Sequence, residues 1–192
     1  MTQTPVKLTF EQYLEYDDGT NNRYELFNGE LRSMAPKSEE NGWTVLWLRD
    51  VFVQFVNPRL VRPNQGELQV PSNPQNRYPD LVVLREEHLF QTKKRLTITL
   101  NMAPPQLVVE VVSPYRNQND ENYRRDYVDK RLQYEQLGIP EYWIIDPKAK
   151  VVTVLILVNG KYQETKFTGN QRIVSPTFPK LELTPAQVLQ VS

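Results

Sequence analysis

The sequence predicts an α/β (α+β) domain, and three observations carry that prediction. Two apolar runs, 79–84 and 107–114, each carry one carboxylate and are typical of strands that are buried on both faces. Asn-Gly pairs at 28–29 and 159–160 stand between strand-like segments and predict two β-hairpins. Apolar residues recur at helical spacing between residues 45 and 56. With 192 residues, the chain is expected to form one domain over residues 1–192.

The N-terminal third contains two predicted helices around a hairpin. Thr9 and Gln12 have the spacing of a capping box, which starts a helix that runs to about Tyr16. The hairpin follows at residues 23–34, and a long core helix is expected from Ser38 to about Val56. Trp43 and Trp47 broaden the apolar surface of that helix and are interpreted as packing residues.

The rest of the chain alternates strands with two further helices. The helix expected over 120–137 is stopped by Gly138 and Pro140, and the last helix starts after Thr184 as N-cap with Pro185 in its first position. The expected strands lie at 60–62, 67–70, 80–84, 107–112, 141–147, 151–158 and 161–167, with a short one near Ile173.

Composition excludes several classes of site. The chain has no cysteine and one histidine, His88, which excludes disulfides, thiol nucleophiles and most zinc sites. Lys plus Arg and Asp plus Glu both total 23, so the overall charge does not point to nucleic acid or membrane. No signal pattern and no bilayer-length apolar run is present, which predicts a soluble cytoplasmic protein without a membrane partner.

Asp80 and Glu110 each lie in one of the two buried apolar runs. A carboxylate there is costly unless a cation accompanies it, so a cation is expected between them. At 100° per residue, Lys130 falls on the same helix line as Tyr123, Tyr127, Tyr134 and Leu137, a face that should be buried. Glu25, on the first hairpin, is a third candidate acid.

Two interpretations of these residues stay open from spacing alone. Three carboxylates and an amine are what metal-assisted phosphodiester hydrolysis requires, since Mg²⁺ prefers oxygen ligands and a lysine can orient the attacking water. An acidic residue on a strand is, however, more often paired with a cation or with backbone amides than with a metal ion. In that case Lys130 and Glu110 would make a structural ion pair. Spacing alone favours the structural interpretation.

Five segments in order resemble the PD-(D/E)XK nuclease superfamily, in its branch of small bacterial proteins described as "putative restriction endonucleases". The resemblance covers nearly the whole chain. The segments are Arg23-Tyr24-Glu25-Leu26 with Asn28-Gly29-Glu30-Leu31, Pro79-Asp80-Leu81-Val82, Val109-Glu110-Val111-Val112-Ser113-Pro114, Asp126 with Lys130 and Tyr134, and Gly138 to Pro147.

The resemblance implies a restriction endonuclease-like core, with a central mixed β-sheet flanked by helices and β-hairpins towards both termini. It also implies that Asp80 and Glu110 are metal ligands, with magnesium or manganese as cofactor, and that Glu25 is an auxiliary acid. The standard motif has lysine where this chain has Val112, and Lys130 from the following helix takes that role. Asn41 stands where a histidine is expected.

The function expected from these residues is metal-dependent endonuclease activity on DNA, catalysed by Asp80, Glu110, Lys130 and Glu25. Arginines 116, 124, 125 and 131 flank the site in sequence and are expected to meet phosphates. The alternative is a catalytically degenerate nucleic-acid-binding or assembly protein that keeps the fold. A hydrolase of a small phosphorylated molecule is a third reading. The expected partners are DNA and a second copy of the chain, as a homodimer.

Overall fold

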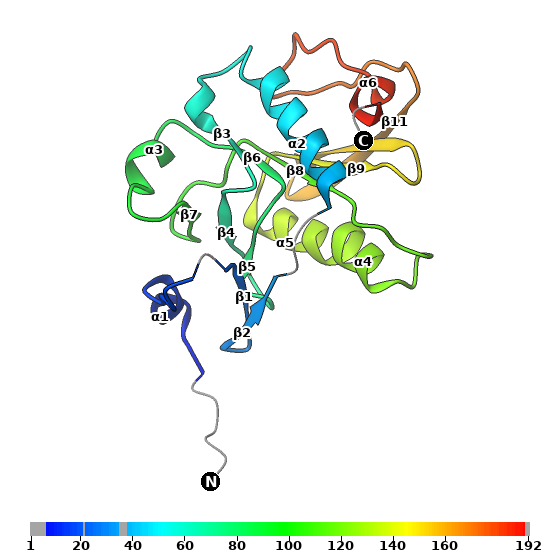
Figure 1. Ribbon diagram of the computed structural model, residues 1–192. Helices are drawn as coiled ribbons and strands as arrows, with labels where there is room; N and C mark the ends of the chain where they lie inside the picture. Colours follow the sequence, from blue (N-terminus) through cyan, green and yellow to red (C-terminus); the bar gives the residue numbers. More distant parts are fainter. Residues whose placement is uncertain (1–6, 21, 35–37, 191–192) are drawn as a thin grey trace.

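The protein, described from a computed structural model over residues 7–20, 22–34 and 38–190, is built on a six-stranded mixed sheet (Figure 1). The strand order is β11-β10-β9-β8-β6-β3, and β8 and β9 are the parallel pair while the other neighbours are antiparallel. These strands are β3 (Val61–Pro63), β6 (Leu81–Val83), β8 (Leu107–Val111), β9 (Glu141–Asp146), β10 (Val151–Val158) and β11 (Lys161–Thr168).

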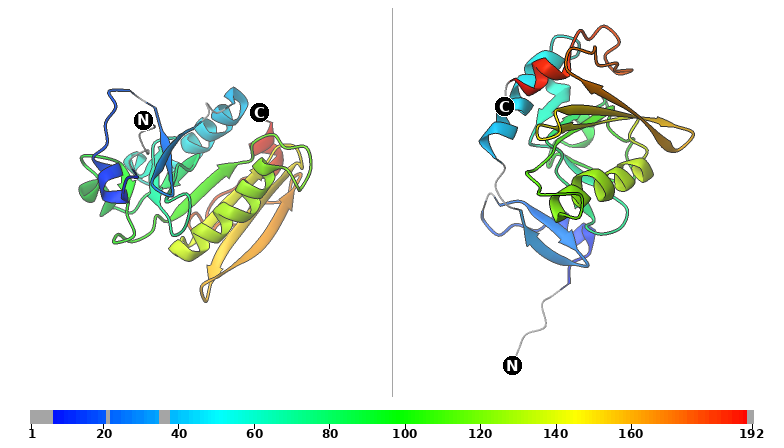
Figure 2. Two further views of the ribbon diagram at one scale, coloured as in Figure 1. Left: turned by 90° about the horizontal axis from the view of Figure 1, so that it is seen from below. Right: turned by 90° about the vertical axis from the view of Figure 1, so that its right-hand side faces the viewer.

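The central strands are buried on both faces because a helical layer covers each face. On one face, α2 (Glu39–Phe52) and α6 (Pro185–Leu189) share an apolar core with the sheet. On the other face, α5 (Lys130–Leu137) packs through Tyr134 against a second core. Figure 2 shows the two helical layers on opposite sides of the strands. The central mixed sheet flanked by helices is therefore confirmed.

An N-terminal unit with its own small core adjoins the sheet. Helix α1 (Phe10–Leu14), started by the predicted Thr9 capping box, packs against the hairpin β1 (Tyr24–Phe27) and β2 (Glu30–Ser33). Asn28 and Gly29 both have positive φ, as the two central positions of a type I′ turn require. A three-stranded sheet lies beside this unit and consists of β5 (Asn76–Arg77), β4 (Glu67–Gln69) and β7 (Thr97–Ile98).

The helix predicted over 120–137 is continuous but not uniform. It consists of α4 (Glu121–Arg124), the π-helical turn η2 (Arg125–Asp129) and α5, and it ends at Gly138 in the left-handed conformation. A π turn is wider than an α turn, so a count of 100° per residue does not hold across it. Tyr127 and Lys130, which the count placed on one line, accordingly contact two different acids, Asp146 and Glu110.

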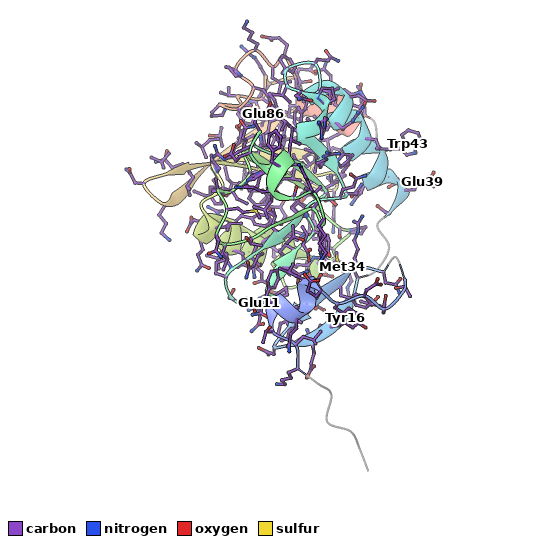
Figure 3. The ribbon with its side chains drawn as sticks, turned by 90° about the vertical axis from the view of Figure 1, so that its left-hand side faces the viewer. Glu11, Tyr16, Met34, Glu39, Trp43 and Glu86 are labelled. Atoms are coloured by element: carbon purple, nitrogen blue, oxygen red, sulfur yellow. The ribbon has the colours of Figure 1, made fainter. Side chains whose placement is uncertain are left out.

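Most other elements lie where they were predicted, with three corrections. Helix α2 ends at Phe52 rather than Val56, because residues 53–56 form turns before the short η1 (Pro58–Leu60). Trp43 is 57% exposed, so its interpretation as a packing residue was wrong, whereas Trp47 packs against the core. Figure 3 shows Trp43 projecting outward from α2.

The third correction concerns Ile173, which is buried but lies in an irregular segment. Its backbone N–H donates to the Leu183 carbonyl at 2.7 Å, without forming a ladder that would make a strand. The short helix α3 (His88–Gln91) was not predicted. In the described part of the chain, no helix has the length and apolarity to cross a bilayer. Residues 1–6, where no signal pattern was found, lie outside the described part.

Candidate functional site

Asp80, which directly precedes β6, and Glu110, which lies on β8, are brought together by the pairing of these two strands. Strands β6 and β8 pair antiparallel with Leu81 opposite Val109, so one further step in the same register brings Asp80 opposite Glu110. Residues opposite each other share a face of the sheet, and here it is the face that α5 covers. Both acids are buried, at 4% and 1% exposure, and the Val111 N–H donates to Asp80 Oδ2 at 2.6 Å.

Lys130 provides a cation beside these acids. Its Nζ lies 2.7 Å from Glu110 Oε2 and 2.9 Å from Asp126 Oδ1, while Tyr134 donates its hydroxyl to Glu110 Oε1 at 2.7 Å. Burial disfavours the charged amine, but the Glu110, Asp126 and Asp80 carboxylates outweigh it and raise the pKa of Lys130. Lys130 is therefore an ammonium ion at neutral pH in this arrangement.

Asp126 connects Lys130 to Arg125. Burial raises the pKa of this carboxyl, but Lys130 and Arg125 outweigh burial and lower it to about 2. Arg125 donates to both oxygens of Asp126, at 3.0 and 3.1 Å, and to Ser113 Oγ at 2.8 Å. Asp126 also accepts the Ser113 backbone N–H at 3.1 Å. The chain leaving the Glu110 strand is thus tied to the helix that carries Lys130.

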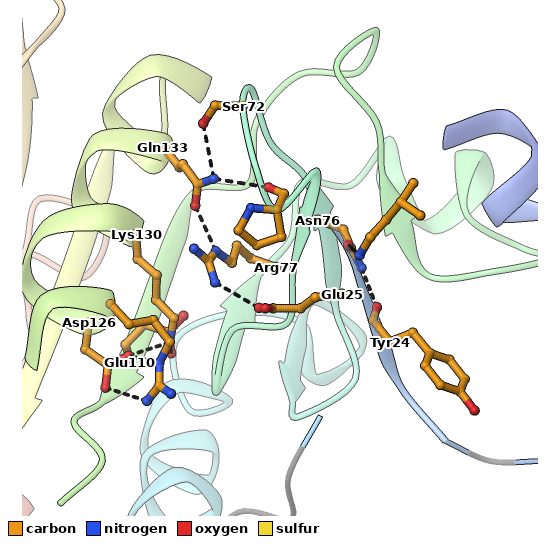
Figure 4. Close-up of polar contacts among 12 residues, drawn as sticks. Tyr24, Glu25, Ser72, Asn76, Arg77, Glu110, Asp126, Lys130 and Gln133 are labelled. Atoms are coloured by element: carbon orange, nitrogen blue, oxygen red, sulfur yellow. Dashed lines mark hydrogen bonds and ion pairs between the residues drawn. The ribbon is translucent and has the colours of Figure 1, made fainter. Parts of the chain in front are cut away.

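Glu25 enters the same region from the N-terminal hairpin. Its Oε1 accepts from Arg77 Nη1 at 2.8 Å, and the Nε of Arg77 donates to Gln133 Oε1 on α5, also at 2.8 Å (Figure 4). Arg77 is buried and therefore holds the hairpin acid against the body of the domain. Glu25 thus pairs with Arg77, whereas Lys130 pairs with Glu110 and Asp126.

One pocket of about 550 Å³ brings the predicted residues together. Glu25, Asp80, Glu110 and Lys130 all line it. Glu25 comes from β1, Glu110 from β8 and Lys130 from α5, while Asp80 directly precedes β6. Of the four flanking arginines, Arg125 lines the pocket. The other three, 116, 124 and 131, lie in ion pairs with Asp120, Asp129 and Glu164.

The donors that line this pocket suit a hard cation. Within the described residues, no three His, Asp or Glu side chains gather as a metal cluster. A metal ion bound in this pocket would therefore have Asp80 and Glu110 as its protein side-chain ligands. Mg²⁺ is commonly held in that way, with water and substrate oxygens in its other positions. A carboxylate oxygen keeps a second lone pair after accepting one hydrogen bond, so the contacts of Asp80 and Glu110 do not exclude a cation.

The two positions that depart from the nuclease motif have different surroundings. Val112 is 3% exposed and belongs to the apolar core, where a lysine would be buried. Asn41 lines the pocket, and its amide donates to the Val111 carbonyl at 3.4 Å. Asn41 therefore joins the start of α2 to the strand that carries Glu110.

Sequence reasoning also missed Glu67, a buried acid with 1% exposure. Its carboxylate accepts from Arg95, Thr97, Tyr13 and Asn76, and so joins α1 to the small sheet. Glu67 begins the expected strand 67–70, in which polar Glu67 and Gln69 alternate with apolar Leu68 and Val70. This pattern is typical of a strand whose polar face meets water, so it does not signal the burial of Glu67. Asp126 and Tyr134 were named only as parts of a motif, and their contacts with Lys130 and Glu110 depend on the fold.

Comparisons with known proteins agree with this architecture. A solved structure described as that of "a putative nuclease belonging to DUF820 from Anabaena variabilis ATCC 29413" is similar, with a TM-score of 0.70 and 15% identity over 96% of this chain and 98% of that chain. At 15% identity, the similarity of the two structures supports a shared fold. A search of curated proteins found no match. The model of the Uma2 family, described as "Putative restriction endonuclease", matches residues 10–186, and this chain therefore belongs to that family.

Proposed function

We propose that this protein is a metal-dependent endonuclease that hydrolyses phosphodiester bonds in DNA. The observation that carries the proposal is the meeting of Asp80, Glu110 and Lys130 in one pocket, on two adjacent strands and the helix that covers them. Membership of a family described as restriction endonucleases supports the same chemistry. Asp80 and Glu110 are the proposed metal ligands, and magnesium or manganese is the proposed cofactor.

A bound divalent ion would supply Lewis acidity towards the phosphate and lower the pKa of a water molecule. The protein's own contribution begins with the placement of the two carboxylates. The Val111 N–H fixes Asp80, while Tyr134 and Lys130 fix Glu110. Hydrogen bonds that lock the ligands in place keep the geometry ready before substrate arrives.

Lys130 acts in this proposal as a cation and not as a base, because its neighbours raise its pKa. An ammonium has three N–H donors, and contacts to Glu110 and Asp126 use two of them. In the described part of the chain the third has no protein acceptor, and we assign it to the attacking water or to a phosphate oxygen. Such a donor offsets negative charge that develops in the transition state.

Glu25 is the proposed auxiliary acid. Arg77 holds its carboxylate at the pocket wall, on the opposite side from the helix that carries Lys130. A carboxylate held in this way can accept a hydrogen bond from the attacking water and orient it. Arg125, which lines the pocket beside Ser113, is placed to contact a phosphate oxygen.

The test is cleavage of supercoiled plasmid and of single-stranded DNA with Mg²⁺, with Mn²⁺ and with EDTA. We expect metal-dependent cleavage by the wild type, and at least a 100-fold loss in Asp80→Asn, Glu110→Gln and Lys130→Met. Glu86→Gln, an exposed site remote from the pocket, is the control and should cleave normally. Cleavage that survives Asp80→Asn and Lys130→Met would exclude this site.

One observation favours the alternative, a degenerate nucleic-acid-binding or assembly protein. Both oxygens of Glu110 already accept hydrogen bonds from protein side chains, which is a stable arrangement without metal. Metal titration separates the two functions, because an ion that binds the folded state raises the melting temperature. A rise with Mn²⁺ that Asp80→Asn abolishes supports the nuclease, and an unchanged melting temperature supports the alternative.

A further inference from the structure

The N-terminal hairpin has two chemically distinct faces. Glu25 lies opposite Arg32 in the ladder. Two residues further along, the Met34 N–H donates to the Arg23 carbonyl. Arg23, Glu25 and Arg32 therefore share a face. The other face, with Leu26 and Tyr24, packs on the small core around α1. The hairpin thus presents two arginines beside the candidate auxiliary acid.

Each of these arginines is positioned by an aromatic ring. The Arg23 guanidinium lies over the ring of Tyr78, 5.4 Å from its centroid, and that of Arg32 lies 3.7 Å from the centroid of Phe27. A ring that stacks on the flat face of a guanidinium fixes its orientation and leaves the N–H groups at its edge available as donors.

In the part of the chain that the structure describes, the hairpin arginines have no carboxylate partner, and in this they differ from the four arginines that the sequence predicts to meet DNA. Arginines 116, 124, 125 and 131 all lie in ion pairs with carboxylates. Within the described residues, which include every aspartate and glutamate of the chain, neither Arg23 nor Arg32 has a carboxylate at ion-pair distance. Two acids, Glu25 and Glu30, share their face, and Glu25 pairs with Arg77.

Both arginines lie at the pocket. Arg32 lines it directly, and so does Tyr78, the residue on which Arg23 stacks. Tyr78 also lines a neighbouring cavity of about 260 Å³, whose wall includes Arg23. Arg32 therefore lies in the wall of the pocket and Arg23 in the wall of the neighbouring cavity, and Tyr78 lines both.

We propose that the hairpin β1–β2 is a grip for the DNA backbone, in which Arg23 and Arg32 contact phosphates on either side of the bond that is cut. This inference rests on the proposed function. Arginine suits the task because its planar fork matches two phosphate oxygens. Contacts of this kind position a strand without reading its sequence. The hairpin supplies locally the positive field that the neutral chain lacks overall.

The experiment measures binding and cleavage separately. Fluorescence anisotropy with a labelled DNA oligonucleotide, in EDTA so that no turnover occurs, gives Kd over a range of salt concentrations. We expect Arg23→Gln and Arg32→Gln each to weaken binding roughly three- to tenfold, and each to reduce the slope of log K against log salt by about one. Arg32→Lys should retain most of the slope, since it keeps the charge.

Arg59→Gln is the matched control. Arg59 is exposed in η1 and does not line the pocket, so its Kd should stay within about twofold of the wild type. Unfolding midpoints identify any variant that has lost its fold. Because a cation–π contact at an exposed site is weak, neither hairpin substitution is expected to unfold the protein.

Each outcome separates the hairpin grip from the proposed activity. Wild-type cleavage with unchanged Kd and KM in both hairpin variants would overturn the grip and leave the endonuclease in place. Weakened binding in those variants, with no cleavage under any metal, would support the grip and overturn the endonuclease. Preference for an RNA oligonucleotide of the same sequence would overturn the assignment to DNA.

Discussion

The ammonium of Lys130 lies 2.7 Å from Glu110 Oε2, so that a single contact joins the helical layer to the strand that carries a candidate metal ligand. The same ammonium reaches Asp126 at 2.9 Å, four residues earlier on its own helix. One lysine therefore balances two acids that are each 1% exposed. Both the stability of the fold and the proposed catalysis depend on Lys130, and unfolding and cleavage assays measure the two effects separately.

Replacement of Lys130 by methionine keeps the apolar stem and removes the charge. We expect a loss of about 3 to 5 kcal/mol in the free energy of unfolding, because Glu110 and Asp126 remain buried without this cation. Urea unfolding at pH 7 measures it. The control is Lys166→Met, whose side chain is 62% exposed and lies 3.6 Å from Glu164, and a change below about 1 kcal/mol is expected there. Equal losses in the two variants would contradict the buried pair.

The carboxyl of Asp126 makes an acid-dependent contribution to stability. Its pKa of about 2 in the folded protein lies below the ordinary 3.8, a difference worth about 2 kcal/mol. That stability is fully present above about pH 4 and is lost as the pH falls through about 2. Asp126→Asn should therefore be less stable than the wild type at pH 7, and the gap should narrow between pH 4 and pH 2.

Urea unfolding at pH 7, 4, 3 and 2 checks the prediction for Asp126. Asp129→Asn on the same helix is the control, since Asp129 is 43% exposed and its contact with Arg124 is long, at 3.8 Å. It should change stability by less than about 1 kcal/mol at any of these pH values. A gap between the wild type and Asp126→Asn that is constant with pH would disprove the assignment.

Glu67 is expected to be as important for stability as the acids in the pocket. In Glu67→Gln, an amide NH₂ would face donors from Arg95 or Thr97, so at least one buried contact becomes a repulsion. We expect a loss of about 3 to 5 kcal/mol in chemical unfolding. The matched control is Glu15→Gln, an exposed partner of Lys94, which should leave the unfolding midpoint unchanged.

His88 should make stability depend on pH between 7.5 and 5.5. It is fully buried: Nδ1 accepts the Arg85 N–H at 3.1 Å and Nε2 donates to the Ala103 carbonyl at 2.8 Å. Burial lowers its pKa despite the bond to Ala103, so the neutral ring is favoured. Its stabilisation is complete above the ordinary pKa of about 6.5 and is lost as the pH falls below it.

Melting temperatures at pH 7.5, 6.5 and 5.5 check the prediction for His88. The wild type should melt lower at each step, and His88→Gln should show a smaller dependence on pH. The comparison isolates the titration of His88, because His88 is the chain's one histidine and no other side chain ordinarily titrates in this range. Parallel curves for the two proteins would show that another group is responsible.

The strands and hairpins could be predicted from the sequence because their signals are local. Apolar runs identified β6 and β8, and Asn-Gly pairs identified both hairpins. The side of the helix on which Lys130 lies could also be predicted. The π turn precedes Lys130, so the four-residue spacing between Lys130 and Tyr134 falls entirely within α5, where 100° per residue holds. These predictions required no knowledge of which strands are neighbours.

The remaining parts of the site depend on contacts between distant segments. The burial of Glu67 follows from partners up to 54 residues away, and the pairing of Glu25 with Arg77 spans 52 residues. Arg23 and Arg32 differ from the chain's other arginines only in which side chains surround them. Trp43 lies about 180° round α2 from Phe52, which packs in the core under the sheet, and its side chain is therefore exposed.

The two edges of the central sheet bear on how copies of this protein meet in concentrated solution. Edge strand β3 is three residues long and ends in Pro63, while β11 carries Lys161, Glu164 and Lys166 along its length. Short edges, prolines and charged side chains all oppose the addition of a further strand. The sheet is thereby protected against edge-to-edge aggregation, and a homodimer would have to form through another surface of the protein.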